Sequence, residues 1–295
     1  MAEALRVAAP AKLNLYLHVT GKRADGYHLL DGLVAFADIH DTLALASASS
    51  LAFTAEGPFA SALGDGESNL VVRAARELGA KAGFEPNVRL VLTKMLPVAS
   101  GIGGGSADAA ACLRGLASLQ DLDPNSPILR EVAARLGSDI PVCVAGQAAF
   151  IGGVGADIEP APRLPPVWVV LVNPGIGLPT PDVYRARQGA FTPPMRFSES
   201  PRTAAELAEW LMARSNDLTE PAIGIVPEIG SVLAVVGESR GCLLARMSGS
   251  GATCFGLYDD ANTAHAAADA IRTRQRNWWV AAGQLLDDTS KLVAD

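Results

Sequence analysis

The pattern of apolar positions along the chain predicts alternating strands and helices. In residues 13–19 an aliphatic side chain stands at every second position, which is the period of a half-buried β-strand. Short apolar runs predict further strands at residues 5–7, 33–46, 88–93, 167–172, 242–246, 253–258 and 278–281. Apolar residues at helical spacing predict helices at residues 70–83, 128–136, 203–214, 227–236 and 261–273. From residue 167 onward, the alternation of strands and helices predicts a small α+β sandwich with helices on one face of a mostly antiparallel sheet.

One stretch stands apart from this pattern, residues 96–119, which read LPVASGIGGGSADAAACLRGLASL. Four glycines within five positions leave backbone N–H groups bare, and an alanine-rich helix follows them directly. The free amides of a first helical turn and the positive end of the helix dipole favour an anion, so the stretch predicts a phosphate site. A flexible linker is the alternative, but linkers are not usually followed by such a densely apolar helix.

The common phosphate loops do not fit this stretch. A P-loop needs Lys and then Ser or Thr after its last glycine, whereas Gly105 is followed by Ser106 and Ala107. The dinucleotide-binding fingerprint fails because Ser106 replaces its third glycine. The glycine loop of protein kinases returns as a strand and not as a helix.

A proline-rich segment, residues 159–166 (EPAPRLPP), predicts a boundary between two domains. The expected domains are residues 1–160, which hold the glycine loop, and residues 161–295. A chain of 295 residues is long enough for two ordinary domains with well-buried cores.

Charge and composition narrow the functional classes. A net charge of −7 opposes non-specific binding of nucleic acid, so local groups must hold any anionic ligand. The longest strongly apolar run, residues 167–172, is too short to span a bilayer, and the first residues lack the features of a signal peptide. The four cysteines form no C-x-x-C pair, and the four histidines show no metal-ligand spacing. We therefore expect a cytoplasmic protein with reduced thiols and no membrane or nucleic-acid partner.

Several polar residues have both an ordinary structural interpretation and a functional one. Lys12 precedes the strand at 13–19, where a solvated charge is the usual interpretation. Asp139 lies between a glycine and a proline, a common setting for a turn or a helix cap. Asn69 fits an N-cap of the helix at 70–83. Tyr27 and His28 close a turn-rich segment and are compatible with a simple loop anchor, although loops often carry function.

Three segments together resemble the signatures of the GHMP kinase superfamily: residues 10–14 (PAKLN), 97–111 and 247–252 (MSGSGA). Residues 10–28, 96–110, 136–142 and 173–184 also resemble, in the same order, one member whose acceptor carries a cytidylyl group. The resemblance extends from end to end. It implies an N-terminal ribosomal-protein-S5-like domain, a C-terminal ferredoxin-like α/β sandwich and an active site in the cleft between them.

The activity that this resemblance implies is transfer of the γ-phosphoryl group of ATP to the tertiary 2-hydroxyl of cytidylyl-methylerythritol. Asp139 would act as the general base and Lys12 as its cationic partner. The loop that would wrap the ATP phosphates comprises Pro97, Val98, Ala99, Ser100, Gly101, Ile102, Gly103, Gly104, Gly105, Ser106, Ala107 and Asp108. Asn69 and Lys94 match further ATP-contacting positions. The substrate-binding positions are matched by Asn14, Tyr27, His28, Thr180 and Tyr184, with the two tyrosines placed to stack on cytosine.

One position departs from the superfamily pattern: Ala107 stands where a second serine is usual, which puts one phosphate or Mg²⁺ contact in question. We expect Mg²⁺ to be held through the ATP phosphates, with Ser106 as the candidate protein ligand. A kinase of homoserine, mevalonate or a sugar and a non-catalytic nucleotide-binding protein remain open alternatives. Residues 26–28 and 179–184 favour the cytidylylated acceptor, since a cytosine-free substrate would not require them. The expected assembly is a monomer or a weak homodimer.

Overall fold

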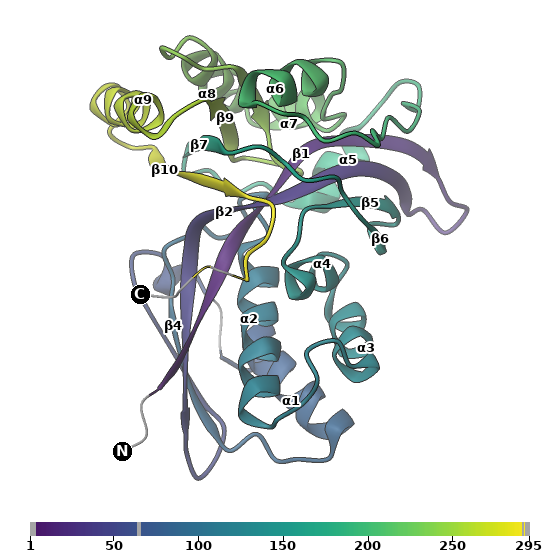
Figure 1. The fold of residues 1–295 in the computed structure, drawn as a ribbon, viewed down its shortest axis with the longest axis vertical. Coiled ribbons are helices and arrows are strands. Elements are labelled where there is room, and N and C mark those ends of the chain that lie inside the picture. The colour runs from purple at the N-terminus through teal and green to yellow at the C-terminus, as the bar shows by residue number, and fades with distance from the viewer. Residues whose placement is uncertain (1–3, 64–65, 291, 293–295) are drawn as a thin grey trace.

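The structure is a computed structural model that describes residues 4–63, 66–290 and 292 (Figure 1). Its strands are β1 (Leu5–Lys22), β2 (His28–Ser47), β3 (Ala52–Glu56), β4 (Val88–Thr93), β5 (Ala149–Gly153), β6 (Asp157–Pro160), β7 (Val167–Asn173), β8 (Leu244–Met247), β9 (Cys254–Tyr258) and β10 (Trp279–Leu286). Its α-helices are α1 (Leu70–Ala82), α2 (Gly104–Leu119), α3 (Pro127–Leu136), α4 (Ile140–Ala145), α5 (Thr180–Ala186), α6 (Ala204–Met212), α7 (Thr219–Ile225), α8 (Glu228–Gly237) and α9 (Ala261–Arg274). Short 3₁₀ helices cover Ala60–Ala62 and Gly66–Ser68.

The strands form one sheet, whose main path is β3-β4-β2-β10-β7-β9-β8, while β1 and β5 join it through β2. Among the described strands, the pairing of β3 with β4 is parallel and the other pairings are antiparallel, as predicted. The last strand, β10, connects the two halves of the chain because it pairs with β2 on one side and with β7 on the other. The division expected after residue 160 falls between β6 and β7, and it stays a prediction.

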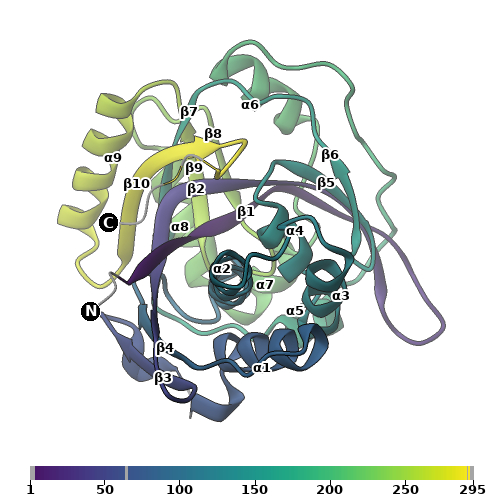
Figure 2. The same cartoon turned by 60° about the horizontal axis from the view of Figure 1, so that its bottom comes forward.

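The helices gather in two groups. Helices α1 to α4 lie together on one side of β1 and β2, and Figure 2 shows α2 end-on with α1, α3 and α4 around it. Helices α5 to α9 gather at the other end of the molecule, around β7 to β9 (Figure 1). The expectation that the helices after residue 166 cover one face of their sheet is wrong, because α8 and α9 pack in one core cluster while α6 packs in the other. Strand β7 is apolar on both faces, so both faces need a cover.

Strand β1 differs from the predicted half-buried strand. It is continuous over Leu5–Lys22 and carries irregularities between Pro10 and Lys12, between Asn14 and Tyr16, and between Val19 and Gly21. As a result Leu13 and Leu15 pack in one core cluster, whereas Leu17 and Val19 pack in the other. The expected alternation therefore breaks at Asn14/Tyr16, because a bulge moves the following side chains to the opposite face.

Helix α2 carries the glycine loop and packs closely against β1 and β2. A Cβ at Gly115 would lie 2.7 Å from Leu45 Cδ1 and 3.3 Å from Val7 Cγ2, so glycine permits this approach without a shift of the Leu45 side chain. Alanines supply most of the buried face of the helix and also keep its neighbours near. This packing fixes the N-terminus of α2 relative to β1, which carries Lys12.

Candidate active site

A cleft of about 940 Å³ opens beside the N-terminus of α2. Most of the site residues that the motifs predict line it, although they come from segments far apart in the sequence. The predicted residues in its wall are Lys12, Asn14, Tyr27, His28, Lys94, Pro97, Val98, Ala99, Ser100, Gly101, Gly103, Gly104, Gly105, Ser106, Asp139, Thr180 and Tyr184. The structure therefore brings the candidate base, the glycine loop and the candidate stacking residues into one cavity.

Lys12 and Asp139 form the ion pair at the centre of this cleft. Lys12 Nζ lies 2.9 Å from Asp139 Oδ2 and donates a hydrogen bond of 2.8 Å to Asn14 Oδ1. The Lys12 side chain is buried, whereas that of Asp139 is 36% exposed and so remains open to a ligand. Asp139 occupies the N-cap position of α4 but makes no capping hydrogen bond, so the simple cap interpretation is wrong for its side chain.

The glycine loop is attached directly to the strand that carries Lys12. The amide of Lys12 donates a 2.9 Å hydrogen bond to Ile102 O. Gly103 has a φ of 64°, and a Cβ there would lie 3.0 Å from Lys12 Cε. The glycine thus leaves room for the lysine side chain beside the loop and also adopts a left-handed conformation that favours glycine.

A second glycine turn, residues 248–252, is hydrogen-bonded to the glycine loop before α2. Ser248 Oγ accepts a hydrogen bond from the Asn14 amide and donates one of 3.0 Å to Gly101 O. The amide of Thr253 donates a 3.0 Å bond to Ser100 O. These bonds hold the glycine loop against the second turn, so the bare amides before α2 keep a set position for phosphate oxygens.

The aromatic side chains of Tyr27, His28 and Tyr184 form the aromatic end of the cleft wall. The rings of His28 and Tyr184 are stacked with centroids 5.1 Å apart, and Tyr27 is 66% exposed at the mouth. Residues 180–184 belong to helix α5, although Pro179 and Pro181 in the sequence favour a loop there. Burial, together with the positive charges of Lys22 and Arg187, lowers the pKa of His28, so this ring is neutral at pH 7.

Thr180 and Tyr184 lie one helical turn apart on α5 and face the same cleft. Thr180 Oγ1 is 2.8 Å from Ser250 Oγ, which joins α5 to the second glycine turn. Burial and the neighbouring negative charge of Asp139 raise the pKa of the Tyr184 hydroxyl. The aromatic end and the ion pair are therefore close enough to act on a single substrate.

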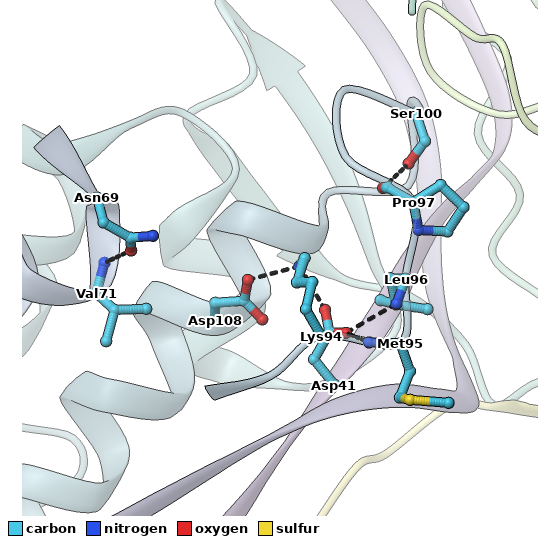
Figure 3. Close-up of polar contacts among 9 residues, drawn as sticks. All are labelled: Asp41, Asn69, Val71, Lys94, Met95, Leu96, Pro97, Ser100 and Asp108. Atoms are coloured by element: carbon cyan, nitrogen blue, oxygen red, sulfur yellow. Dashed lines mark hydrogen bonds and ion pairs between the residues drawn. The ribbon is translucent and has the colours of Figure 1, made fainter. Parts of the chain in front are cut away.

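Four of the predicted ATP-binding residues lie outside the cleft wall: Asn69, Ile102, Ala107 and Asp108. Asn69 caps α1, because its Oδ1 accepts a 2.9 Å hydrogen bond from the Val71 amide (Figure 3). Its interpretation as a cap is confirmed, and its contact with a nucleotide stays a prediction. Ala107, on α2, is buried in the hydrophobic core, and Asp108 Oδ2 accepts a hydrogen bond from Lys94 Nζ.

Five polar or charged residues of the cleft wall were not singled out from the sequence, namely Lys22, Asp25, Ser138, Arg185 and Ser250. Lys22 stands at the end of β1, paired in register with His28. Its place in the turn-rich segment before His28 was the available signal, but a lysine at a strand end is usually solvated. Ser250 belongs to the second glycine turn, whose approach to α5 is a long-range contact that the sequence does not show.

The part of the chain that the structure describes holds no group of three or more His, Cys, Asp or Glu side chains arranged to bind a metal ion. Within the same residues, no helix has the length and apolar character needed to cross a membrane. The four cysteines are free, and Cys112, Cys143 and Cys254 are buried.

Comparisons with known proteins agree with this geometry. The GHMP kinases N terminal domain matches residues 69–147, and GHMP kinases C terminal matches residues 198–277. The chain is 53% identical over 280 residues to the 4-diphosphocytidyl-2-C-methyl-D-erythritol kinase of Paramagnetospirillum magneticum, which covers 95% of this chain and 98% of the relative.

Solved structures show the same relationship. A crystal structure of 4-(cytidine 5'-diphospho)-2C-methyl-D-erythritol kinase superposes with a TM-score of 0.77 at 35% identity, and the match covers 95% of this chain and 99% of that one. A homoserine kinase from Cytophaga hutchinsonii has a TM-score of 0.68 at 16% identity, with 98% and 96% covered, so it shares the fold alone.

Proposed function

This chain belongs to the GHMP kinase family, and from that premise we propose that it phosphorylates the 2-hydroxyl of 4-(cytidine 5'-diphospho)-2-C-methyl-D-erythritol with ATP. The family and the two-domain fold expected from the motifs are confirmed. The reaction makes the chain an enzyme of isoprenoid precursor synthesis by the non-mevalonate route. We expect it to work in the cytoplasm as a monomer or a weak homodimer.

One observation carries the catalytic part of this proposal. The 2.9 Å pair of Lys12 Nζ and Asp139 Oδ2 faces the same cleft as the glycine loop, and Lys12 lies directly against Gly103. A carboxylate and an ammonium at this place support proton removal and charge neutralisation at the same reacting centre. Phosphoryl transfer needs little else, because its transition state spreads negative charge over the transferred oxygens.

The reaction then follows from the positions of these groups. The loop amides and the N-terminus of α2 hold the ATP phosphates. Asp139 accepts the proton of the acceptor hydroxyl as that oxygen forms a bond to the γ-phosphorus, and the bond from the γ-phosphorus to the leaving ADP oxygen breaks. Lys12 orients Asp139 and balances the negative charge that develops between the two substrates.

The residues present are compatible with Mg²⁺ that arrives with the nucleotide. No acidic cluster of the described residues offers a complete protein site, whereas Ser106 lines the cleft in the first turn of α2. We propose that the ATP phosphates and water supply most ligands and that the Ser106 hydroxyl is the protein ligand. When bound, the ion would supply positive charge that neutralises the phosphates during transfer.

The aromatic end of the cleft supports the cytidylylated acceptor over the homoserine, mevalonate and sugar alternatives. His28, Tyr27 and Tyr184 offer aromatic surfaces to a base in the same cleft as the glycine loop. Stacking on an aromatic side chain contributes on the order of 1–3 kcal/mol for each base. An acceptor without cytosine would leave this surface unused.

The test is ATP turnover with a panel of alcohols that contains the cytidylylated acceptor, methylerythritol without the cytidylyl group, homoserine and mevalonate. We expect kcat/KM for the cytidylylated acceptor to exceed that for the others by roughly 100-fold or more, from two stacking contacts and the lost orientation. Equal kcat/KM for methylerythritol would refute the assignment of the acceptor. ATP binding without turnover of any alcohol would favour the non-catalytic alternative.

A further inference from the structure

Three ionisable side chains meet in the protein interior at the first turn of α2. Lys94 Nζ lies 2.5 Å from Asp41 Oδ2 and 2.6 Å from Asp108 Oδ2 (Figure 3). All three residues are at least 98% buried. They come from β2, from the segment just after β4, and from α2, so this cluster joins the three elements that surround the glycine loop.

The two carboxylates of the cluster are not equivalent. Asp41 uses both oxygens: Oδ2 accepts from Lys94, and Oδ1 accepts from the amides of Met95 at 2.5 Å and Leu96 at 2.8 Å. Asp108 uses only Oδ2, and its Oδ1 is buried with no hydrogen-bond partner among the described residues. The three hydrogen-bond donors around Asp41 stabilise a carboxylate anion, whereas the lack of a donor at Asp108 Oδ1 favours the neutral acid.

Electrostatics agree with this difference. Burial raises the pKa of Asp108 to about 8; the ammonium of Lys94 opposes this rise and the charge of Asp41 adds to it. This rise favours the protonated form of Asp108, with which the cluster holds one positive and one negative charge. The neutral sum explains why the fold tolerates the cluster in its interior.

The cluster acts on the glycine loop through its first residues. The chain leaves β4 at Thr93, passes through Lys94, Met95 and Leu96, and enters the loop at Pro97. Asp41 binds all three of these intermediate residues. At the other end of the loop, a Cβ on Gly104 would lie 3.1 Å from Lys94 Nζ and 3.8 Å from Asp41 Oδ2. The same carboxylate thus lies beside both ends of the loop.

We propose that Asp41 is a positioning residue for ATP, which holds Lys94 and the start of the glycine loop in register with the N-terminus of α2. Asp41 itself does not line the cleft, whereas Lys94 does. The proposal rests on the proposed function only in that the glycine loop binds the phosphates of ATP. Asp108 serves as a neutral hydrogen-bonding partner of Lys94.

Asp41→Asn tests the proposal, because the amide keeps the size of the side chain but leaves the buried ammonium without its anion. The dissociation constant of a non-hydrolysable ATP analogue, measured by calorimetry without acceptor, should rise about tenfold or more. KM for ATP should rise similarly, while KM for the cytidylylated acceptor changes less than twofold. Affinity for the analogue equal to that of the unmodified protein would overturn the proposal.

Asp31→Asn is the matched control. Asp31 is on the same strand, is 1% exposed and accepts hydrogen bonds from Tyr16 Oη, the Met195 amide and Arg196 Nε. It does not line the cleft. Both variants should lower the thermal midpoint, but only Asp41→Asn should weaken the ATP analogue. Equal loss of nucleotide affinity in both variants would show that any loss of stability weakens ATP binding, and it would refute a positioning role for Asp41.

Asp108→Asn keeps the proposal testable if Asp41→Asn does not fold. An amide resembles the protonated acid, so the variant should fold and weaken the ATP analogue less than threefold. A tenfold loss would contradict the division between an anionic Asp41 and a neutral Asp108. Failure of the acceptor assignment is recognised separately: the unmodified protein would bind the analogue but would not phosphorylate the cytidylylated alcohol. A protein that does not bind the analogue at all would overturn both proposals.

Discussion

Replacing Gly101 by alanine should disrupt the contact between the two glycine turns. Gly101 has a φ of 78°, in the left-handed region. A Cβ there would lie 2.5 Å from Ser248 O and 2.6 Å from Gly251 O, and both atoms belong to backbone that cannot rotate away. The substitution therefore forces the loop and the turn apart.

The magnitude combines two effects. A non-glycine residue in the left-handed region costs roughly 1–2 kcal/mol. Forcing a methyl group into a closely packed site costs roughly another 1–3 kcal/mol. The free energy of unfolding of Gly101→Ala should thus fall by about 2–5 kcal/mol. Because the loop also loses its set position, KM for ATP should rise by about tenfold or more.

The assay is denaturant unfolding together with steady-state kinetics at saturating acceptor. Gly105→Ala is the control for the fold, since its Cβ would lie 3.7 Å from Leu70 Cδ1 in a helical position. Its free energy of unfolding should stay within about 1 kcal/mol of the unmodified value. The reasoning is refuted if Gly101→Ala unfolds like the control and keeps its KM for ATP.

Two further predictions concern the aromatic end of the cleft. Lys22 lines the cleft and has no ion-pair partner among the described residues, so Lys22→Gln should weaken the binding of cytidine diphosphate by about fivefold and leave the binding of cytidine unchanged. Lys81→Gln, at a residue outside the cleft wall, is the control. Equal weakening of the binding of both ligands by Lys22→Gln would contradict a phosphate contact. The positive charge of Lys22 also helps to lower the pKa of His28, so the same variant should raise that pKa in an NMR titration. Because the pKa of His28 in the folded state lies below its ordinary value, acidification through the ordinary histidine range lowers the free energy of unfolding. Lys22→Gln should make this decrease in the free energy of unfolding smaller. An unshifted His28 titration in the variant would contradict the assigned cause.

Local signals in the sequence were sufficient for several elements. Helix α1 begins after the capping Asn69 and ends before Gly83, whose φ is 80°, and both signals are visible in the sequence. Strand β4 matches its predicted range, because its short β-branched run is bounded by turn residues. The glycine loop was predicted from the bare amides that it presents before a helix.

Short helices were harder to predict because they offer too few turns for a period to emerge. Residues 142–151 look like one apolar run, but the structure divides them between α4 and β5 at Gly146, which has a φ of 63°. Helix α7, of 7 residues, was missed for the same reason. Tertiary packing stabilises such helices more than their own propensity does.

The buried charged residues whose partners lie far away in the sequence were the hardest part of the site to predict. Asp41 stands in an apolar strand, and a charge there needs a buried partner. That signal was visible, but its partner Lys94 lies 53 positions away, and nothing local connects the two. Lys12 and Asp139 are separated even further, and only the resemblance to the family brought them together before the structure did.

The role of Asp139 as base is the central claim, and Asp139→Asn tests it most directly. The amide keeps the shape of the side chain but cannot accept the proton of the acceptor hydroxyl. In single-turnover measurements with saturating ATP and cytidylylated acceptor, we predict that the rate of phosphoryl transfer falls by about 10²–10⁴-fold, while the dissociation constant of the ATP analogue changes less than about threefold. A transfer rate close to that of the unmodified protein would contradict the claim.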